Sequence, residues 1–227
     1  DAYKSLHEAL YHASFHNNLK LKINYIDSED LEKSQPNNLL SDCDGILVPG
    51  GFGNRGFEGK ISAIKYAREK NIPFFGICLG LQMAVVEFAR NVCNIKNANS
   101  RESGRKIKDF VIDIMDHQKD LDTKGGNMRL GDYPCEIKKS TRVSEAYKKN
   151  KISERHRHRY EVNPKYHSVL TKNGLVLSGL SPDGKLAETI EIKEHPWFVA
   201  CQFHPEFKSK PFQPHPLFVQ FIKASSK

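Results

Sequence analysis

A short, fully apolar run over residues 72–77 is followed without a linker by a helical pattern over residues 79–92. Strands that lack any polar position are buried on both faces, which is typical of the centre of a parallel sheet. Upstream, the apolar residues 46–48 precede a second helical pattern over residues 58–70, so strand and helix alternate. We therefore predict an α/β fold in which helices flank a mostly parallel central sheet, with the site at the carboxyl ends of its strands.

The remaining elements are predicted from hydrophobic periodicity and from turn residues. We expect helices over residues 3–13 and 217–224, strands over 19–25, 106–114, 175–177, 186–192 and 197–203, turns at 36–38 and 181–184, and an exposed loop over 116–127. No repeat, low-complexity tract or linker divides the sequence, so residues 1–227 are predicted to form one domain.

The composition excludes several classes of protein. No apolar run approaches the roughly 20 residues that span a bilayer, and the first residues lack the apolar core of a signal peptide. The five cysteines are an odd number without a C-x-x-C pair, which favours free thiols in a reducing compartment. The net charge is +8, but the lysines are spread along the chain without an aromatic, basic motif. We expect a cytoplasmic protein that binds neither membrane nor nucleic acid.

Cys78 lies between the apolar strand and the following helix, with Gly76 and Gly80 two residues to either side. The strained strand-to-helix turn that exposes a nucleophile needs small residues at these positions, because its backbone crowds the neighbouring strands. The field at a helix N-terminus also favours a thiolate. A buried, unreactive thiol is the alternative, and the glycines alone do not decide between the two.

His204 follows another apolar strand and is followed by Pro205 and Glu206. It is expected at a strand end, where its imidazole could take the proton of Cys78 and return it to a leaving amine. Glu206 could hold the second ring nitrogen, as the third member of a catalytic triad does. A capped loop histidine and a surface carboxylate are the structural alternatives. The combination of thiol, imidazole and carboxylate indicates an enzyme that transfers acyl groups.

A glycine-rich loop follows the strand at residues 46–48. Residues 51–56 fit the G-x-G-x-x-G pattern of dinucleotide-binding folds. The next strand, however, ends in Cys78 and lacks the acidic residue that would hold a ribose, which argues against a nicotinamide cofactor. Alternatively, the backbone N–H groups of Gly51 and Leu79 form an oxyanion hole beside Cys78.

Residues 155–159 form an alternating Arg-His run. His156 and His158 could bind a metal, but two histidines without further ligands are weak evidence for one. The run could also contact nucleic acid or form a solvated face. A fourth possibility is a guanidinium that holds a carboxylate substrate.

These motifs point to a known family. The chain resembles the class I (triad) glutamine amidotransferases, which have flavodoxin-like layering, and within them it is similar to the glutaminase domain of CTP synthases. The resemblance rests on residues 47–53, 76–82, 97–100, 125–131, 154–163 and 204–206. It implies glutamine hydrolysis through a γ-glutamyl thioester on Cys78, with His204 and Glu206 completing the triad. The glutamine-binding positions that it implies are Gly51, Phe52, Leu79, Gln82, Glu102 and Arg159.

The resemblance also implies a larger enzyme, while this domain itself is expected to hold no metal or other cofactor. An N-terminal synthetase domain, which this sequence lacks, would use the ammonia with Mg²⁺ and ATP to convert UTP to CTP. The full enzyme would be a homotetramer with GTP as an allosteric activator. The loop around Arg55 is the candidate place for that control.

Some features depart from the family pattern. The strand that usually precedes the first helix is missing, Arg101 stands where Thr is usual, and residues 104–124 do not align. No glycine-lysine loop for ATP is present, so this chain alone is not expected to make CTP. Two competing functions are considered. The first is a γ-glutamyl peptidase or another amidotransferase that shares the triad, and the segments at 126–131 and 155–163 argue against it. The second is a catalytically inactive regulatory or nucleic-acid-binding relative, and the complete triad argues against that.

Overall fold

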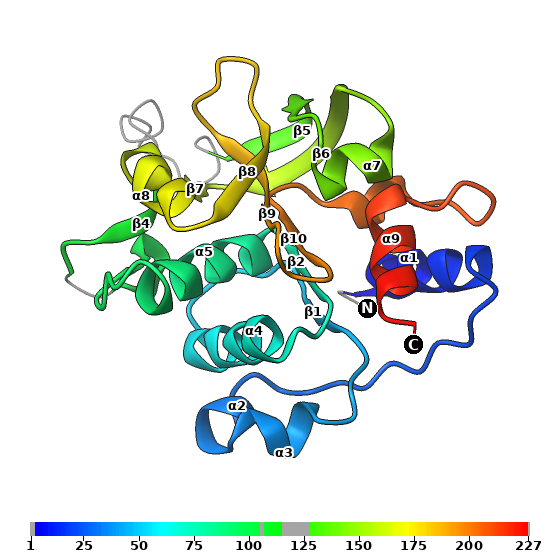
Figure 1. Cartoon of the computed structure of the whole chain (residues 1–227), viewed down its shortest axis with the longest axis horizontal. Helices are drawn as coiled ribbons and strands as arrows, with labels where there is room; N and C mark the ends of the chain where they lie inside the picture. The colour runs from blue at the N-terminus through cyan, green and yellow to red at the C-terminus, as the bar shows by residue number, and fades with distance from the viewer. Residues whose placement is uncertain (1–2, 105–106, 115–127, 227) are drawn as a thin grey trace.

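A computed structural model describes residues 3–104, 107–114 and 128–226 (Figure 1). The first half contains α1 (Lys4–His16), α2 (Asp30–Lys33), α3 (Pro36–Leu40), β1 (Ile46–Val48), α4 (Phe57–Lys70), β2 (Phe74–Ile77), α5 (Leu79–Asn91), β3 (Asn99–Ser100), the 3₁₀ turn η1 (Arg101–Ser103) and β4 (Phe110–Ile114). The second half contains β5 (Arg129–Ile137), α7 (Arg142–Tyr147), β6 (Lys151–His158), β7 (Tyr160–Val162), η2 (Pro164–Tyr166), α8 (His167–Lys172), β8 (Leu175–Leu180), β9 (Ala187–Ile192), β10 (Phe198–Cys201), η3 (Pro205–Lys208) and α9 (Pro216–Ala224).

The central sheet has seven strands in the order β1-β2-β10-β9-β8-β5-β6. Its parallel part consists of β1, β2 and β10, where Phe74 lies opposite both Ile46 and Phe198. The other neighbouring pairs are antiparallel. The predicted α/β architecture is confirmed, but the sheet is mixed and not mostly parallel. Short connections such as the turn at 181–184 join successive strands as hairpins, which makes those pairs antiparallel.

The two faces of β2 bury their side chains in two separate clusters. Phe74 packs in a cluster with residues of α4 and α5, while Phe75 and Ile77 pack in a cluster with residues of α1 and α9. Figure 1 shows α1 and α9 together on one side of the parallel strands and α4 and α5 on the other. All four residues of β2 are buried, as its apolar sequence predicted. The helices thereby hold rigidly the strand that ends at Cys78.

A second sheet has three strands, in the order β3-β4-β7, and packs against α5. Its strand β4 falls within the strand predicted over residues 106–114. The loop predicted over residues 116–127 lies outside the described residues. This small sheet is relevant to the site because Glu102 lies in η1, the turn that follows β3, and Arg159 directly precedes β7.

Most predicted elements are confirmed in type. Helices α1, α4, α5 and α9 and strands β1, β2, β8, β9 and β10 all occur where they were expected. The predicted strand over residues 19–25 is wrong, because this extended segment pairs with no strand among the described residues. Its alternation arises because Leu19, Leu21 and Ile23 pack against the cluster of α1 and α9. The turn predicted at 36–38 is also wrong, since Pro36 begins the short helix α3.

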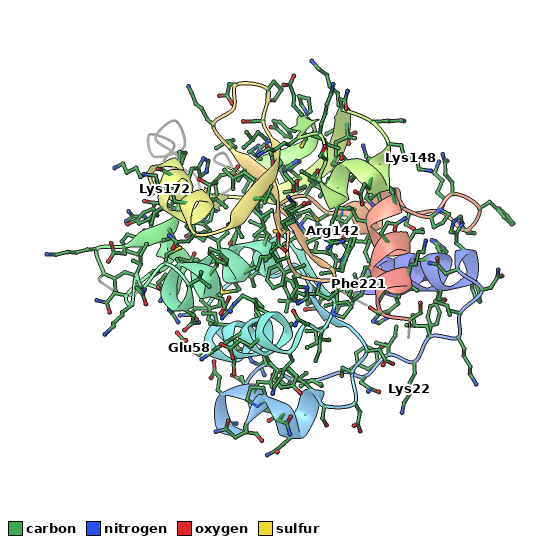
Figure 2. The ribbon with its side chains drawn as sticks, in the orientation of Figure 1. Lys22, Glu58, Arg142, Lys148, Lys172 and Phe221 are labelled. Carbon is green, nitrogen blue, oxygen red and sulfur yellow. The ribbon has the colours of Figure 1, made fainter. Side chains whose placement is uncertain are left out.

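No helix in the described ranges is both long and apolar enough to cross a bilayer. Figure 2 shows three basic side chains, Lys22, Lys148 and Lys172, on well-separated parts of the molecule. This arrangement agrees with the spread of lysines along the sequence.

Candidate active site

Cys78 occupies a strained turn between β2 and α5. It is the N-cap of α5 and has φ 51° and ψ −100°, a backbone conformation that residues other than glycine rarely adopt. Its N–H donates to the carbonyl of Cys201 at 2.7 Å, which ties the turn to β10. Strain of this kind occurs mostly where function requires it, so the turn supports the interpretation of Cys78 as a nucleophile.

The glycines on either side of Cys78 allow this turn to form. A Cβ on Gly80 would lie 2.1 Å from the carbonyl oxygen of Val48, and one on Gly76 would lie 2.8 Å from the backbone of Gly80. Both distances are far below van der Waals contact. The predicted crowding of the backbone around Cys78 is therefore confirmed, and it involves the neighbouring strand β1.

His204 and Glu206 follow β10 and lie beside this turn. The His204 Nδ1 atom is 2.8 Å from Oε1 of Glu206, and the backbone N–H of His204 donates to Arg155 O at 2.8 Å. A Cβ on Gly50 would lie 2.7 Å from the His204 ring and 3.5 Å from Cβ of Cys78. The thiol and the imidazole thus meet at Gly50, which must lack a side chain to let them do so.

The electrostatics of His204 favour its charged form. Burial lowers the pKa of His204, but the nearby Cys78 and Glu206 outweigh burial and raise this pKa to about 10. The Nε2 atom is buried and has no hydrogen-bond partner in the described part of the chain. With Nδ1 engaged by Glu206, Nε2 is the ring atom available for proton transfer.

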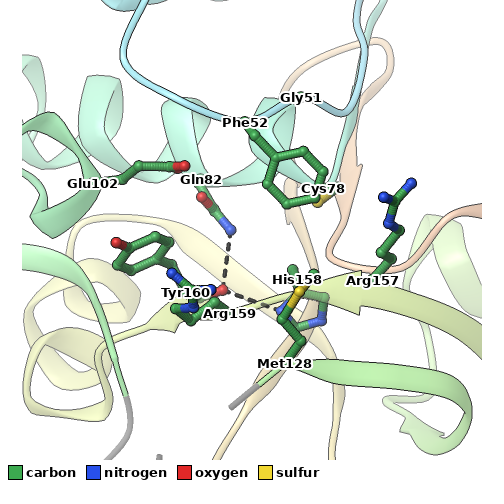
Figure 3. Close-up of a pocket in the computed structure, with 10 residues that line it drawn as sticks. All are labelled: Gly51, Phe52, Cys78, Gln82, Glu102, Met128, Arg157, His158, Arg159 and Tyr160. Atoms are coloured by element: carbon green, nitrogen blue, oxygen red, sulfur yellow. Dashed lines mark hydrogen bonds between the residues drawn. The ribbon is translucent and has the colours of Figure 1, made fainter. Parts of the chain in front are cut away.

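A cavity of about 280 Å³ opens in front of Cys78, as Figure 3 shows. Its lining residues are Gly51, Phe52, Cys78, Gln82, Glu102, Met128, Arg157, His158, Arg159 and Tyr160. Five of the predicted glutamine-binding residues are therefore brought together around the nucleophile. The sixth, Leu79, follows Cys78 at the start of α5 but does not line the cavity, nor do His204 and Glu206.

The cavity carries opposite charges. Burial raises the pKa of Glu102, whereas a hydrogen bond from Gly53 N at 2.8 Å and the charge of Arg159 act in the opposite direction. Arg101, the unusual residue before Glu102, forms an ion pair with Asp113 of β4 and lies over the Phe110 ring. The Glu102 carboxylate lines the cavity all the same, so the cavity offers an anion and a cation to a zwitterionic ligand.

The two predicted oxyanion donors lie next to each other. A Cβ on Gly51 would be 3.3 Å from the side chain of Leu79. As the first residue of α5, Leu79 has an N–H that no residue within the helix can accept. The loop's Gly53 N–H is directed at Glu102. This arrangement fits an oxyanion hole beside Cys78 better than a phosphate cradle.

Residues 155–158 of the alternating Arg-His run lie on β6, where successive side chains point to opposite faces, and Arg159 directly follows this strand. Glu154, His156 and His158 are buried, while Arg155 and Arg157 are exposed. Among the described residues no cluster of three metal-binding side chains occurs, and His156 Nδ1 instead lies 2.8 Å from His158 Nε2. The period of two could have revealed that His156 and His158 are buried, but not which residues line the cavity, because both Arg157 and His158 do.

A buried charge cluster of Arg129, Glu161 and Glu188 lies close to the histidines of this strand. The Arg129 guanidinium lies 2.9 Å from Oε1 of both Glu161 and Glu188, and both carboxylates are fully buried. One cation cannot neutralise two anions. Burial accordingly raises the pKa of Glu161 to about 8, with Arg129 only partly opposing the effect.

Other cavity residues were not predicted as site residues: Met128, Arg157, His158 and Tyr160. Gln202 was likewise missed. It is fully buried two residues before His204, and its side-chain nitrogen lies 3.8 Å from Sγ of Cys78. Its position beside the predicted histidine was the available signal.

Comparisons with known proteins agree with this geometry. The family model for class-I glutamine amidotransferases matches residues 1–224. The CTP synthase of Bdellovibrio bacteriovorus is 55% identical over 230 residues, which cover 100% of this chain and 43% of that protein. The CTP synthase of Clostridium acetobutylicum is 56% identical over 225 residues, covering 99% and 42%. This chain thus spans less than half the length of these relatives.

Among solved structures, the glutaminase domain of Trypanosoma brucei CTPS with bound acivicin superposes with a TM-score of 0.92 at 41% identity. The match covers 99% of this chain and 88% of that one. A GMP synthase component from Thermoplasma acidophilum shares the fold, with a TM-score of 0.57 at 19% identity over 96% of this chain and 87% of that one. The chain therefore belongs to the class I glutamine amidotransferase family and, within it, to the glutaminase domains of CTP synthases.

Proposed function

We propose that this chain hydrolyses the side-chain amide of L-glutamine to glutamate and ammonia, with Cys78 as nucleophile. The observation that carries the proposal is the meeting of Cys78 and the His204–Glu206 pair at Gly50, beside a cavity of opposite charges. Membership of the class I glutamine amidotransferases supports the same substrate.

In the first half of the reaction, the Cys78 thiolate attacks the amide carbon of glutamine and a tetrahedral oxyanion forms. The N–H groups of Gly51 and Leu79 stabilise the negative oxygen. His204 donates its Nε2 proton to the departing nitrogen, ammonia leaves, and a γ-glutamyl thioester remains on Sγ. Glu206 keeps the imidazole in the required orientation through Nδ1.

In the second half, water attacks the thioester carbon. His204, now neutral, takes a proton from this water through Nε2, and the new oxyanion occupies the same position. The C–S bond then breaks, glutamate is released, and the thiolate–imidazolium pair is restored. The raised pKa of His204 favours the imidazolium form of this residue in the resting state.

The cavity charges fit the free amino acid. Arg159 would pair with the α-carboxylate and Glu102 with the α-ammonium, which orients the side-chain amide toward Cys78. Phe52 and Gln82 would contact the intervening part of the substrate. A peptide with a blocked amino or carboxyl group would lose one of the two ion pairs.

We further propose that the chain is the glutaminase half of a CTP synthase, in which a synthetase domain uses the ammonia with Mg²⁺ and ATP to convert UTP to CTP. The similarity to proteins named CTP synthase, of which this chain spans 42 to 43%, supports this assignment. Activation by GTP, a homotetrameric assembly and a cytoplasmic location belong to the same proposal. Arg55, which lies within the glycine loop and pairs with Glu29 at 2.8 Å, is the candidate for GTP control.

Protection of Cys78 from alkylation tests the substrate assignment. The chain would be treated with iodoacetamide in the presence of L-glutamine, D-glutamine or L-asparagine, and modification of each cysteine read by mass spectrometry. We expect L-glutamine alone to slow the labelling of Cys78, while labelling of the half-buried Cys43 stays constant. Equal protection by all three amino acids would contradict the proposal.

A further inference from the structure

The side chain of Gln202 contacts the sulfur of Cys78 without lining the cavity. Its side chain is fully buried, and its backbone N–H donates to Glu188 O at 2.8 Å. The side-chain Nε2 atom lies 3.8 Å from Sγ of Cys78, and Oε1 lies 3.4 Å from Nε2 of Gln82. Gln202 is not among the residues that line the cavity, so it can influence the reaction through Cys78 without touching the substrate.

The orientation of the Gln202 amide is determined by a backbone carbonyl. The carbonyl of Tyr160 can only accept hydrogen bonds, and it lies 3.0 Å from Gln82. The Gln82 side-chain nitrogen must therefore point toward the Tyr160 carbonyl, and the same nitrogen also lies against Gln202. Gln202 must accept this hydrogen bond through its side-chain oxygen. Its side-chain nitrogen then faces the Cys78 sulfur. An exchange of nitrogen and oxygen in Gln82 would place two acceptors in contact at the Tyr160 carbonyl, and an exchange in Gln202 would place two donors in contact.

The Tyr160 carbonyl is itself held by a second donor. His158 Nδ1 lies 3.2 Å from this oxygen, and Figure 3 shows the bonds from Gln82 and His158 converging on it. Burial, with Arg129 adding to it, lowers the pKa of His158 to about 3. The ring is neutral at physiological pH, so Nδ1–H donates to Tyr160 and Nε2 accepts from His156. The amide chain is therefore anchored on β6 and β7.

We infer that Gln202 is a positioning residue that donates an N–H hydrogen bond to the Cys78 sulfur and thereby stabilises its thiolate form. A thiolate accepts such a bond strongly and a thiol only weakly, so a fixed donor favours the charged sulfur. The inference rests on the proposed function only in taking Cys78 as the nucleophile. Gln82 then has two tasks, since it lines the cavity and orients Gln202.

Other groups around the sulfur titrate or carry charge, and the test must separate their effects from that of Gln202. They are His204 with its partner Glu206, Cys201 on β10, and the cavity residues Glu102, Arg157, His158, Arg159 and Tyr160. Gln202 differs from all of these because its amide is neutral, so its replacement by the neutral side chain of methionine leaves the number of charges unchanged.

Substitutions of Gln202 test this role in the complete 227-residue chain. Gln202→Met keeps the length of the side chain and removes the donor, Gln202→Glu presents an acceptor to the sulfur, and Gln213→Met is an exposed control. The readout is the pH midpoint of Cys78 alkylation by iodoacetamide, resolved by mass spectrometry. Because a hydrogen bond to a charged group is stronger than one to a neutral group, we expect Gln202→Met to raise the midpoint by about one pH unit, a roughly tenfold change in the ionisation constant.

Gln202→Glu should raise the midpoint further, and Gln213→Met should leave it unchanged. In glutamine hydrolysis, Gln202→Met should lower kcat about tenfold with KM changed less than about twofold, because the residue does not touch the substrate. An unchanged midpoint in folded Gln202→Met would overturn the inference, whatever the activity. A chain with the expected shift but no glutamine hydrolysis would instead contradict the proposed function.

A measurement on the unsubstituted chain covers the case in which these variants do not fold. The side-chain amide proton of Gln202 should move downfield in NMR spectra with the same pH midpoint as Cys78 alkylation. Cys78→Ala should abolish that titration. An amide proton that does not respond to ionisation of Cys78 would overturn the inference.

Discussion

The backbone of Gly80 in α5 lies against the carbonyl of Val48 in β1, so that a Cβ at position 80 would stand 2.1 Å from that oxygen. This contact sets the distance between the helix that begins after Cys78 and the strand that leads to Gly50 and Gly51. Since a carbonyl oxygen in a buried strand has no room to move, the spacing of the nucleophile and the oxyanion donors depends on the missing side chain.

Gly80→Ala should therefore destabilise the protein, although alanine is normally favoured over glycine in a helix by about 1 kcal/mol. Overpacking of this kind costs about 1–3 kcal/mol, and displacement of the backbone at Cys78 should also lower kcat. Chemical denaturation measures the first effect and glutamine hydrolysis the second. A variant as stable as the original chain would show that α5 and β1 are less tightly packed than described.

Arg159→Ala should raise the KM for glutamine about tenfold or more, because the α-carboxylate loses its cationic partner in a partly buried cavity. The effect on kcat should be smaller, since Arg159 has no part in the proposed proton transfers between Cys78, His204 and the substrate. Lys151→Ala, at the other end of β6 and exposed, provides the control. Steady-state kinetics with both variants decide the matter, and an unchanged KM for Arg159→Ala would remove its assigned role.

Glu161 should make stability depend on pH. Its pKa is raised to about 8 in the folded chain, so the folded state holds a proton that the unfolded state releases near pH 4.5. The stabilisation from this proton is complete below about pH 4.5 and is lost as the pH rises to about 8.

Denaturation of Glu161→Gln tests this dependence, because glutamine imitates the protonated carboxyl. The stability of the original chain relative to the variant should fall by up to about 1.4 kcal/mol per pH unit across that window. Glu32→Gln, at an exposed position of α2, should show no such trend. Parallel pH profiles for the original chain and Glu161→Gln would contradict the cluster as described.

His204 should titrate with a pKa of about 10, and Cys78→Ala should lower it, because Cys78 contributes to raising it. An imidazolium with a raised pKa stabilises the folded state fully below the unfolded value of about 6.5, and this contribution disappears as the pH rises through about 10. NMR titration of the ring proton on Cε1 measures both values, with His204→Gln to assign the signal. If His204 titrated with the same pKa in the original chain and in Cys78→Ala, Cys78 would lie too far from His204 to exchange a proton with it.

The parts of the site that were predictable from the sequence are those where a backbone constraint selects the residue. Gly76 and Gly80 were informative because a side chain at either position would collide with neighbouring backbone, and the apolar β2 indicated a strand covered on both faces. His204 and Glu206 are two residues apart, so their pairing could be expected from sequence distance alone.

The remaining features depend on contacts between distant segments. Strand β6 was not predicted, because its buried residues Glu154, His156 and His158 are polar and give no hydrophobic alternation. Their buried polar atoms find partners that the local sequence does not reveal: His215, far along the chain, lies 3.1 Å from Glu154, and the two histidine rings lie 2.8 Å from each other. The segment 19–25 shows the converse: its alternation resembles a strand, but no partner strand lies beside it within the described ranges.

Release of glutamate and ammonia from L-glutamine, compared between the original chain and Cys78→Ala, tests the central claim most directly. Both products should form in equal amounts with the original chain, even if slowly. Cys78→Ala should release neither while keeping the circular dichroism spectrum of the folded protein. Equal hydrolysis by a correctly folded Cys78→Ala chain would contradict the assignment of Cys78 as the nucleophile.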